Sequence, residues 1–443
     1  MTRSTSPAAD ATPPGATPPA LIPTSGGGTA PVPPHPARRT PGRAPYLGMA
    51  CVILLSGCSL VGADTEPTRT FTIGLDAPLT GNLADLGLGI KYSAELAVAK
   101  ANAKNTVPGV RFVLDAKDDQ GDEKLARANG EAFVADPEVV GVVGPLTSGG
   151  ALTMAPVLAK ADLAEISPSN TAPSLTWGAD YRTKGKVRPY PTYFRTVTTD
   201  AVQGPLLARY ARSQLKAERA VVVSDTKAYG SNLAAEFATA FEEDGGTVQL
   251  RATIEPGTTD FSKLVRQIAA ARPDIVYYGG EHPEGGPLSA QLKAAGVKAP
   301  VAGGDGLHTD GYLKAAGPAS DGDLASNPGI SVEGLASAFT FLDEYQKAAH
   351  PQAPGPFGPY AYDSTWALIE AVGRARQAHG KSGSGTEIRK AVSEAVPDVD
   401  FFGVTGDVSF DEFGDTRNQV ASIYQIQKGN WVAIVPIGRL RDL

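Results

Sequence analysis

The sequence predicts an α/β protein of two lobes, each built on a parallel sheet flanked by helices. Short apolar stretches that suit buried strands alternate with segments whose apolar residues recur at helical spacing. This alternation begins at Phe71, runs to about residue 160, and restarts at Ala220. Two such series indicate two sheets rather than one.

The individual elements follow from this alternation. In the first series we expect strands at 71–75, 111–115 and 139–143, and helices at 87–101, 124–133 and 151–160. In the second series we expect strands at 220–224 and 274–278, and helices at 231–243 and 288–295. Further helices are expected at 332–349 and 361–377, and antiparallel strands within 404–435 with turns at 411–414 and 428–430.

The N-terminus predicts export rather than a folded domain. Residues 1–45 hold 12 of the 36 prolines and few apolar side chains, a composition that favours disorder. Three arginines lie near the end of this stretch (38, 39 and 43). An apolar run (46–55) follows, too short to span a bilayer, and then the sequence Leu-Ser-Gly-Cys ending at Cys58. This ending resembles a bacterial lipobox, so we expect residues 1–57 to be a disordered leader plus signal peptide. Cys58 would then carry lipid, palmitate included, and 58–70 would form a tether. The alternative is an ordinary signal with a spare cysteine.

Charge and cysteine content narrow the function. The chain carries a net charge of −7, and removing residues 1–57, which carry three net positive charges, leaves about −10. An acidic surface argues against nucleic acid as a partner. Of the two cysteines, Cys51 leaves with the signal, so the mature chain can form no internal disulfide.

Polar loops follow the predicted strands. Parallel sheets bind ligands beyond the carboxyl ends of their strands, and the loops there are 76–81, 144–150, 167–171, 225–230, 279–284 and 303–306. Ser148 and Thr171 offer hydroxyls and amides for a carboxylate, while Glu281 and Asp305 offer counter-charges for an ammonium group. Each of these residues, taken alone, also fits a turn or helix cap.

Signatures of catalysis are scarce. The sequence has no Gly-x-Ser-x-Gly elbow, no phosphate-binding loop and no His-Glu-x-x-His zinc pattern. His282 and His308, with Glu281 and Asp305, could form a metal site, but the favoured interpretation is that they are solvated loop residues. We therefore expect no enzyme activity, no cofactor and no metal.

Six stretches together carry a family resemblance. They are PLTGNLADLG (78–87), SPSNTAP (167–173), TTDAVQG (198–204), DTKAYG (225–230), DFS (260–262) and VYYGGEHPE (276–284). With them the chain, from about Phe71 to its C-terminus, resembles the leucine/isoleucine/valine-type solute-binding proteins of ABC transporters, which have the type I periplasmic-binding fold.

The resemblance implies two Rossmann-like lobes that close on a ligand like a Venus flytrap. The chain would cross between them three times, near 196–200, 326–329 and 403–406. The first lobe would then comprise 71–198 and 329–403, and the second 199–328 and 404–443.

The resemblance also implies roles for single residues. Ser148 and Thr171 would hold the ligand's α-carboxylate, Asp305 its α-ammonium, and Tyr229 and Tyr360 would be aromatic walls. The full expected ligand set is Leu86, Thr147, Ser148, Ser169, Asn170, Thr171, Tyr229, Glu281, Asp305 and Tyr360. Leu86 and Glu281 stand where family members have tyrosine, and Gly121 and Thr147 replace a disulfide found in some. With Glu281 added, either two acids share one ammonium or the ligand carries a second positive group.

The expected function is therefore uptake. We expect a monomeric, membrane-anchored receptor outside the cytoplasm that binds a small amino acid, branched-chain or otherwise aliphatic, and delivers it to the permease subunits of an ABC transporter. The alternative is a sensor for an amide, urea or another amino acid-like solute.

Overall fold

The computed structural model describes residues 69–379 and 385–438. The expectations for the leader, the signal peptide and Cys58 lie outside these residues. Among the described helices, none is both long and apolar enough to cross a membrane.

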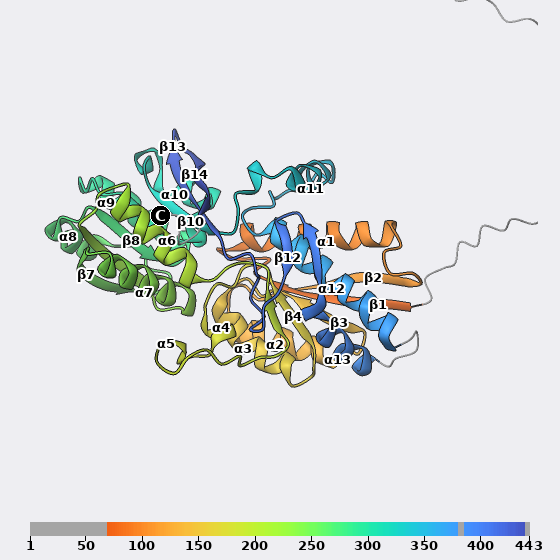
Figure 1. The fold of residues 1–443 in the computed structure, drawn as a ribbon. Coiled ribbons are helices and arrows are strands. Elements are labelled where there is room, and N and C mark those ends of the chain that lie inside the picture. Colours follow the sequence, from red (N-terminus) through yellow and green to blue (C-terminus); the bar gives the residue numbers. More distant parts are fainter. Residues whose placement is uncertain (1–68, 380–384, 439–443) are drawn as a thin grey trace, which may run out of the picture. The chain divides into compact units, whose positions relative to one another are not determined.

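The first lobe is built on a five-stranded sheet whose strands are all parallel, in the order β2-β1-β3-β4-β5 (Figure 1). The strands are β1 (Arg69–Ala77), β2 (Val110–Asp118), β3 (Val139–Val143), β4 (Ala164–Ser167) and β5 (Tyr193–Arg195). Helices α1 (Ala84–Ala103), α12 (Gly358–His379) and α13 (Gly385–Ala395) bury apolar side chains on one face, whereas α2 (Glu123–Ala135) and α3 (Ser148–Ala159) cover the other. Two single-turn helices, α4 (Ser174–Trp177) and α5 (Tyr181–Lys184), lie between β4 and β5 in the sequence.

The second lobe is built on a seven-stranded sheet in the order β14-β13-β10-β9-β8-β6-β7. The strands are β6 (Arg219–Asp225), β7 (Thr247–Ile254), β8 (Ile275–Gly279), β9 (Val301–Gly303), β10 (Leu324–Pro328), β13 (Ala421–Gln427) and β14 (Asn430–Gly438). Strands β6 to β10 are parallel, and β13 and β14 join them as antiparallel partners. Helices α6 (Asp200–Ser213) and α7 (Ala228–Glu243) pack on one face. Helices α8 (Ser262–Ala271), α9 (His282–Ala294) and α10 (Asp310–Ala316) pack on the other.

All the strands and helices expected from the sequence are present, with ends that differ by a few residues. The region expected as helix at 332–349 contains α11 (Ala336–Lys347) after a short 3-10 turn. The predicted fold class, two α/β lobes with parallel sheets flanked by helices, is confirmed by this arrangement.

The third crossing lies later in the chain than expected. A hairpin of β11 (Asp400–Gly403) and β12 (Gly406–Ser409) continues into Phe410, and Val408 and Phe410 pack in the core of the first lobe. The ring of Phe410 lies 5.2 Å from that of Phe194, edge to face. Because these apolar side chains are buried on the first lobe, the chain passes to the second sheet at 417–420, not near 403–406.

The three crossings are hydrogen-bonded to one another. The Thr198 hydroxyl of the first crossing donates to the Gln419 side chain of the third at 2.8 Å. The Gly329 amide of the second donates to the Val420 carbonyl at 2.8 Å. Next to them, the fully buried Arg195 forms an ion pair of 2.7 Å with Asp415. These contacts make the crossings one connected hinge.

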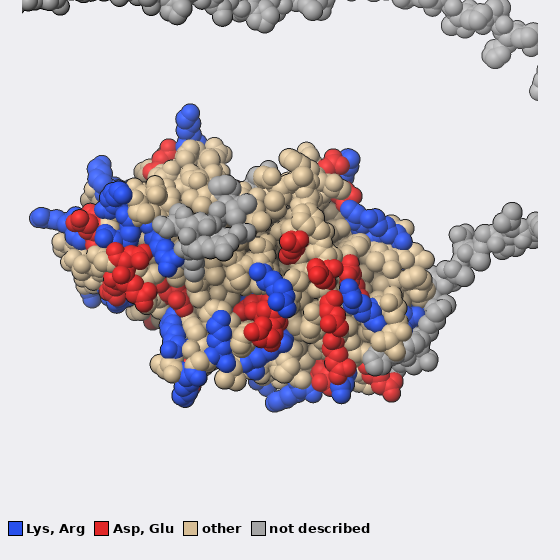
Figure 2. Space-filling view, in the orientation of Figure 1, with Lys and Arg blue, Asp and Glu red and all other residues tan. Residues whose placement is uncertain are grey.

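The surface carries charge of both signs. On the face shown in Figure 2, Lys and Arg side chains are interspersed with Asp and Glu side chains rather than gathered into one basic area. Exposed ion pairs such as Arg127–Glu131 and Arg251–Glu242 belong to this pattern. Mixed signs at short range leave little long-range field on this face.

Candidate functional site

A small cavity lies where the two sheets' loops meet. It measures about 20 Å³ and is lined from the first lobe by Leu86, Leu146, Thr147, Ser148, Ser169 and Phe357, and from the second by Tyr229, Glu281, Asp305 and Gly306. Seven of the ten residues expected from the sequence therefore come together here, and they come from loops far apart in the chain.

The first lobe contributes the start of α3. Thr147 is the N-cap, and its hydroxyl accepts a hydrogen bond of 3.1 Å from the Gly150 amide. Ser148 begins the helix and lies at the cavity with Ser169. The first amides of a helix have no partner within the helix, and they attract an anion. This wall of the cavity is therefore suited to a carboxylate.

A glycine sets the direction of that loop. Gly144 directly follows β3 and has a φ of +109°, and a Cβ at this position would lie 2.1 Å from the Asp76 carbonyl oxygen. Any other residue would be strained by the positive φ and would clash with β1. Gly144 thus allows the chain to turn directly from the buried strand into the start of α3.

The second lobe contributes a buried carboxylate, Asp305. Its Oδ1 accepts hydrogen bonds of 2.9 Å from the Gln203 amide and 2.9 Å from the Tyr229 hydroxyl. The Tyr229 oxygen in turn accepts a bond of 3.0 Å from the Gly306 amide. Burial raises the pKa of Asp305 to about 6, although both hydrogen bonds favour the charged form. At neutral pH Asp305 is therefore mostly ionised, and its negative charge can pair with a cation.

Further polar groups lie beneath Asp305. Asp200 is fully buried, and neither of its carboxylate oxygens has a hydrogen-bond partner among the described residues. Its pKa is raised well above the usual value by burial and then by the charge of Asp305. The hydroxyl of Tyr277 and the Oε1 of Gln203 are also buried without a partner among those residues. Ionisation of one acid disfavours ionisation of the other, and the charge of Arg195 acts in the opposite direction on Asp200.

Glu281 is neutralised within its own lobe. Its Oε2 lies 2.8 Å from Nζ of Lys227, and the Glu281 side chain is only 9% exposed. Burial acts to lower the pKa of Lys227, but the charge and hydrogen bond of Glu281, together with the charges of Asp225 and Glu284, hold the pKa above its usual value. Because Lys227 balances its charge, Glu281 does not add an uncompensated second carboxylate to the cavity.

Three expected residues do not line the cavity. The Asn170 amide donates to the carbonyls of Pro145 at 3.0 Å and Leu146 at 2.7 Å, so it braces the loop before α3. The Thr171 carbonyl accepts from the Asp200 amide at 2.9 Å. Tyr360 packs on the hinge, where a Cβ added to Gly329 would lie 1.8 Å from its hydroxyl.

Sequence reasoning missed Lys227, Gln203 and Phe357. Lys227 lies in a loop that directly follows a predicted strand, so the rule that selected Asp305 could have selected it too. Phe357 is the aromatic residue of the cavity wall and lies three positions before Tyr360. No local pattern in the sequence distinguishes these two aromatic residues.

The two histidines considered for a metal site have other neighbours. His282 Nε2 lies 3.9 Å from Asp85 Oδ2, across the cleft, and the His308 ring lies 3.9 Å from that of Tyr424. Within residues 69–379 and 385–438, no group of three or more His, Cys, Asp or Glu side chains is arranged to hold a metal ion.

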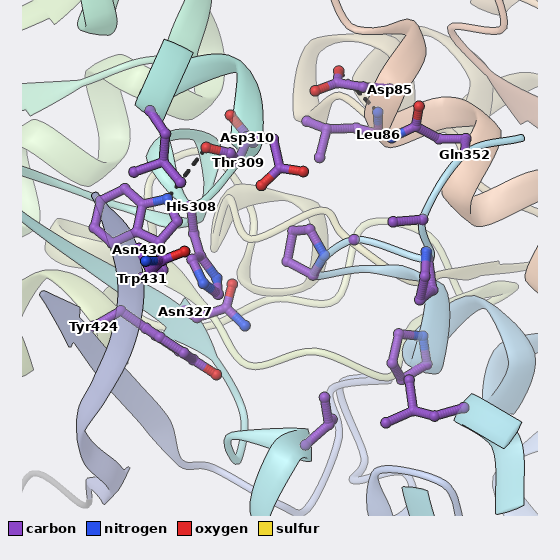
Figure 3. Close-up of a pocket in the computed structure, with 18 of the residues that line it drawn as sticks. Asp85, Leu86, His308, Thr309, Asp310, Asn327, Gln352, Tyr424, Asn430 and Trp431 are labelled. Carbon is purple, nitrogen blue, oxygen red and sulfur yellow. Dashed lines mark hydrogen bonds between the residues drawn. The ribbon is translucent and has the colours of Figure 1, made fainter. Parts of the chain in front are cut away.

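Two larger spaces adjoin the small cavity. One, of about 260 Å³, shares Thr147, Ser148, Tyr229 and Glu281 with it. The other, of about 390 Å³, shares Leu86 and is shown in Figure 3. The cleft therefore contains three adjoining compartments, and the groups suited to a carboxylate and to an ammonium line the one that shares residues with both others.

Comparison with known proteins agrees with this architecture. The chain is 33% identical over 364 residues to the Leu/Ile/Val-binding protein BraC3 of Rhizobium johnstonii, which covers 82% of this chain and 93% of that relative. It is 28% identical to the branched-chain amino acid transporter substrate-binding protein LivJ of Streptococcus pneumoniae, solved with isoleucine, with a TM-score of 0.70 over 83% of this chain and 100% of the other.

A leucine-binding protein from Thermotoga maritima has the same fold, with a TM-score of 0.74 at 23% identity over 84% of this chain and all of that one. Residues 70–430 match the sequence profile described as periplasmic binding protein. That match spans most of the chain and both lobes, and so the chain belongs to the periplasmic binding protein family.

Proposed function

We propose that this protein is the extracytoplasmic solute-binding component of an ABC importer and that it captures a small amino acid, branched-chain or otherwise aliphatic. One observation carries the proposal: the start of α3 in the first lobe and Asp305 in the second line the same cavity. The first group suits a carboxylate and the second an ammonium, which are the two charges that every α-amino acid carries.

The remaining lining supports an aliphatic side chain. Leu86, Leu146 and Phe357 supply apolar surface from the first lobe. An amino acid held by its two charges would place its side chain against these residues. Burial of that side chain favours the closed form, in which both lobes contact the ligand at once.

Delivery to a permease is part of the proposal. The solved relative from S. pneumoniae is named as a transporter substrate-binding protein, and the curated relatives are named for leucine, isoleucine and valine. By this analogy the protein acts without catalysis, as a monomer tethered through lipid at Cys58. Replacing Cys58 with serine should then release it from membranes into the medium, and membrane retention of that variant would contradict the anchor.

Binding of leucine and its analogues tests the function. Thermal shift and calorimetry with the twenty common amino acids should reveal stabilisation by leucine, isoleucine or valine. Leucinamide, which lacks the carboxylate, and 4-methylpentanoate, which lacks the ammonium, should each bind at least tenfold more weakly, because one wall of the cavity is left unpaired. If no amino acid shifts the unfolding temperature, the proposal is wrong.

A further inference from the structure

The largest compartment of the cleft, which we call the side chamber, is not explained by a small ligand. It measures about 390 Å³, whereas the cavity between α3 and Asp305 measures about 20 Å³. Leu86 lines both spaces. Because Leu86 borders both spaces, the far end of a ligand held by its carboxylate and ammonium in the small cavity would reach the larger space at Leu86.

The walls of the side chamber come from both lobes. Figure 3 shows Asp85 and Leu86 on one side, and His308, Tyr424 and Trp431 on the other. The His308 ring lies 3.9 Å from that of Tyr424 and 5.5 Å from that of Trp431, so these three rings form one cluster. The indole nitrogen of Trp431 donates to the Thr309 carbonyl at 3.2 Å, which fixes the ring. Aromatic rings of this kind attract cations through their faces.

Apart from the imidazole of His308, the ionisable groups of the chamber are acidic. Asp85 and Asp310 line it, and no Lys or Arg is among the described residues that do. One Asp85 oxygen accepts a bond of 3.0 Å from the Leu86 amide, and the other lies 3.9 Å from His282 Nε2. Burial lowers the pKa of His282 below its usual value, so at neutral pH this imidazole carries no charge to balance Asp85.

Size, aromatic surface and negative charge together select one class of side chain. A long aliphatic stem can pass Leu86 and the prolines of the 352–359 segment, and a positive end can lie near Asp85, Asp310 and the ring cluster. A ligand ending in a carboxylate would meet two like charges and is disfavoured. A short side chain would leave the chamber filled with solvent.

We propose that the side chamber receives the end of a long cationic side chain, so that the protein also binds amino acids of the arginine and lysine type. This inference rests on the proposed function, because it takes the amino acid head group to be held in the small cavity. It adds the chemical class of the distal group and assigns its recognition to Asp85 and Asp310.

Two pairs of matched ligands test the inference on the mature protein. Citrulline has the shape of arginine without its charge, and norleucine has the stem of lysine without the ammonium. Calorimetry should show arginine binding about tenfold or more tightly than citrulline, and lysine more tightly than norleucine, because two carboxylates and an aromatic face favour a cation. Equal affinities within both pairs would overturn the inference.

A double substitution locates the effect. In the Asp85→Asn, Asp310→Asn variant the ratio of arginine to citrulline affinity should fall close to one. The Asp407→Asn variant, which removes an exposed charge on β12 outside the chamber, should keep the ratio of the unmodified protein. A ratio that survives the double substitution would contradict the assignment to these two acids.

The result also separates this inference from the proposed function. Binding of leucine together with equal affinities for arginine and citrulline would leave the proposed function standing and refute the side chamber's role. Failure of every amino acid to bind would refute both.

Discussion

At the scale of single residues, the wall that the second lobe contributes to the cavity is organised around one carboxylate, Asp305, whose charged form is disfavoured by burial. Asp305 is 3% exposed and receives two hydrogen bonds, yet burial keeps its pKa near 6. Asp200 is also buried, and repulsion between the two carboxylates raises the free energy of ionising both. The charged form of Asp305 is therefore disfavoured in the unliganded protein, and a bound ammonium would stabilise it.

This arrangement predicts a pH dependence of binding. As pH falls through about 6, Asp305 takes up a proton and loses the charge that pairs with the ammonium, so affinity for leucine should fall about tenfold per pH unit below 6. Calorimetry from pH 8 to pH 5 measures this slope. In Asp305→Asn the affinity should be lower by about ten- to a hundredfold at pH 8, and nearly independent of pH. A slope that persists in the variant would contradict the assignment.

The stability of the unliganded protein should change in the opposite direction. The folded-state pKa of Asp305 is raised above that of the unfolded chain, so its contribution is fully present below about pH 4 and is lost as pH rises through 6. Asp305→Asn should therefore melt higher than the unmodified protein at pH 8 and nearly the same at pH 4. A rise in melting temperature with a loss of affinity also excludes simple misfolding of the variant.

The pair of Lys227 and Glu281 gives a second prediction. Replacing Lys227 with methionine leaves Glu281 buried beside the ligand site without its partner at 2.8 Å. We expect the free energy of unfolding to fall by about 1–3 kcal/mol, as measured by urea denaturation. Adding Glu281→Gln should restore most of the loss, because the uncompensated charge is then gone. Additive losses in the double variant would show that the two side chains do not interact.

At the scale of elements, close contacts between helix starts and strand ends place the site residues. A Cβ on Gly230, in the first turn of α7, would lie 2.5 Å from the Gly279 carbonyl oxygen and 2.2 Å from Asp225 Oδ1. Gly279, at the end of β8, is similarly close to the Gly230 carbonyl. Because Tyr229 precedes Gly230, this contact fixes the ring that bonds Asp305. The strand-to-helix pattern predicted both elements but not their separation.

A matched pair of glycine substitutions tests this packing. Gly230→Ala should lower the unfolding free energy by about 1–3 kcal/mol and weaken leucine binding, because α7 must move away from β8. Gly373→Ala, within α12, has only a Val107 methyl at 3.4 Å and should be neutral or slightly stabilising, since alanine favours the helix. Chemical denaturation and calorimetry of both variants measure the contrast. Equal effects at the two positions would show that the α7–β8 contact is unimportant.

At the scale of the whole molecule, the hinge depends on a buried charge network. Arg195 is fully buried and donates to Asp415 and to the carbonyls of Asn170 and Ala172, at 2.7, 2.8 and 3.0 Å. It also donates to the Thr176 hydroxyl. Arg195 precedes the first crossing and Asp415 the third, so one side chain ties together segments 220 residues apart.

Removing this side chain should destabilise the segments that lead into the first and third crossings. Arg195→Gln leaves Asp415 buried and unpaired, and the free energy of unfolding should fall by about 3–5 kcal/mol in a urea titration. Arg219→Gln, which breaks an exposed pair with Asp274, serves as the control and should change stability little. Similar losses in both variants would contradict the hinge role of Arg195.

The sequence by itself determined the fold class, the main strands and helices, and the loops that bear the site. Hydrophobic periodicity depends only on residues close in the sequence, so it predicts strands and helices without knowledge of distant contacts. The expected ranges left out the eight-residue strand β7 and the helices α6, α8 and α13. They also left out β5 and β9, which at three residues each are too short to show a period. The third crossing was also expected too early, since only packing against Phe194 shows that Phe410 belongs to the first lobe.

Tertiary structure alone decided which polar residues line the cavity and which support the loops. Ser148, Glu281 and Asp305 meet because two sheets bring their strand ends together, while Asn170 turns to neighbouring carbonyls. The pairing of Glu281 with Lys227 and the side chamber beyond Leu86 also depend on distances between distant segments. Burial and charge pairing are properties of the assembled cleft, and no local pattern of residues encodes them.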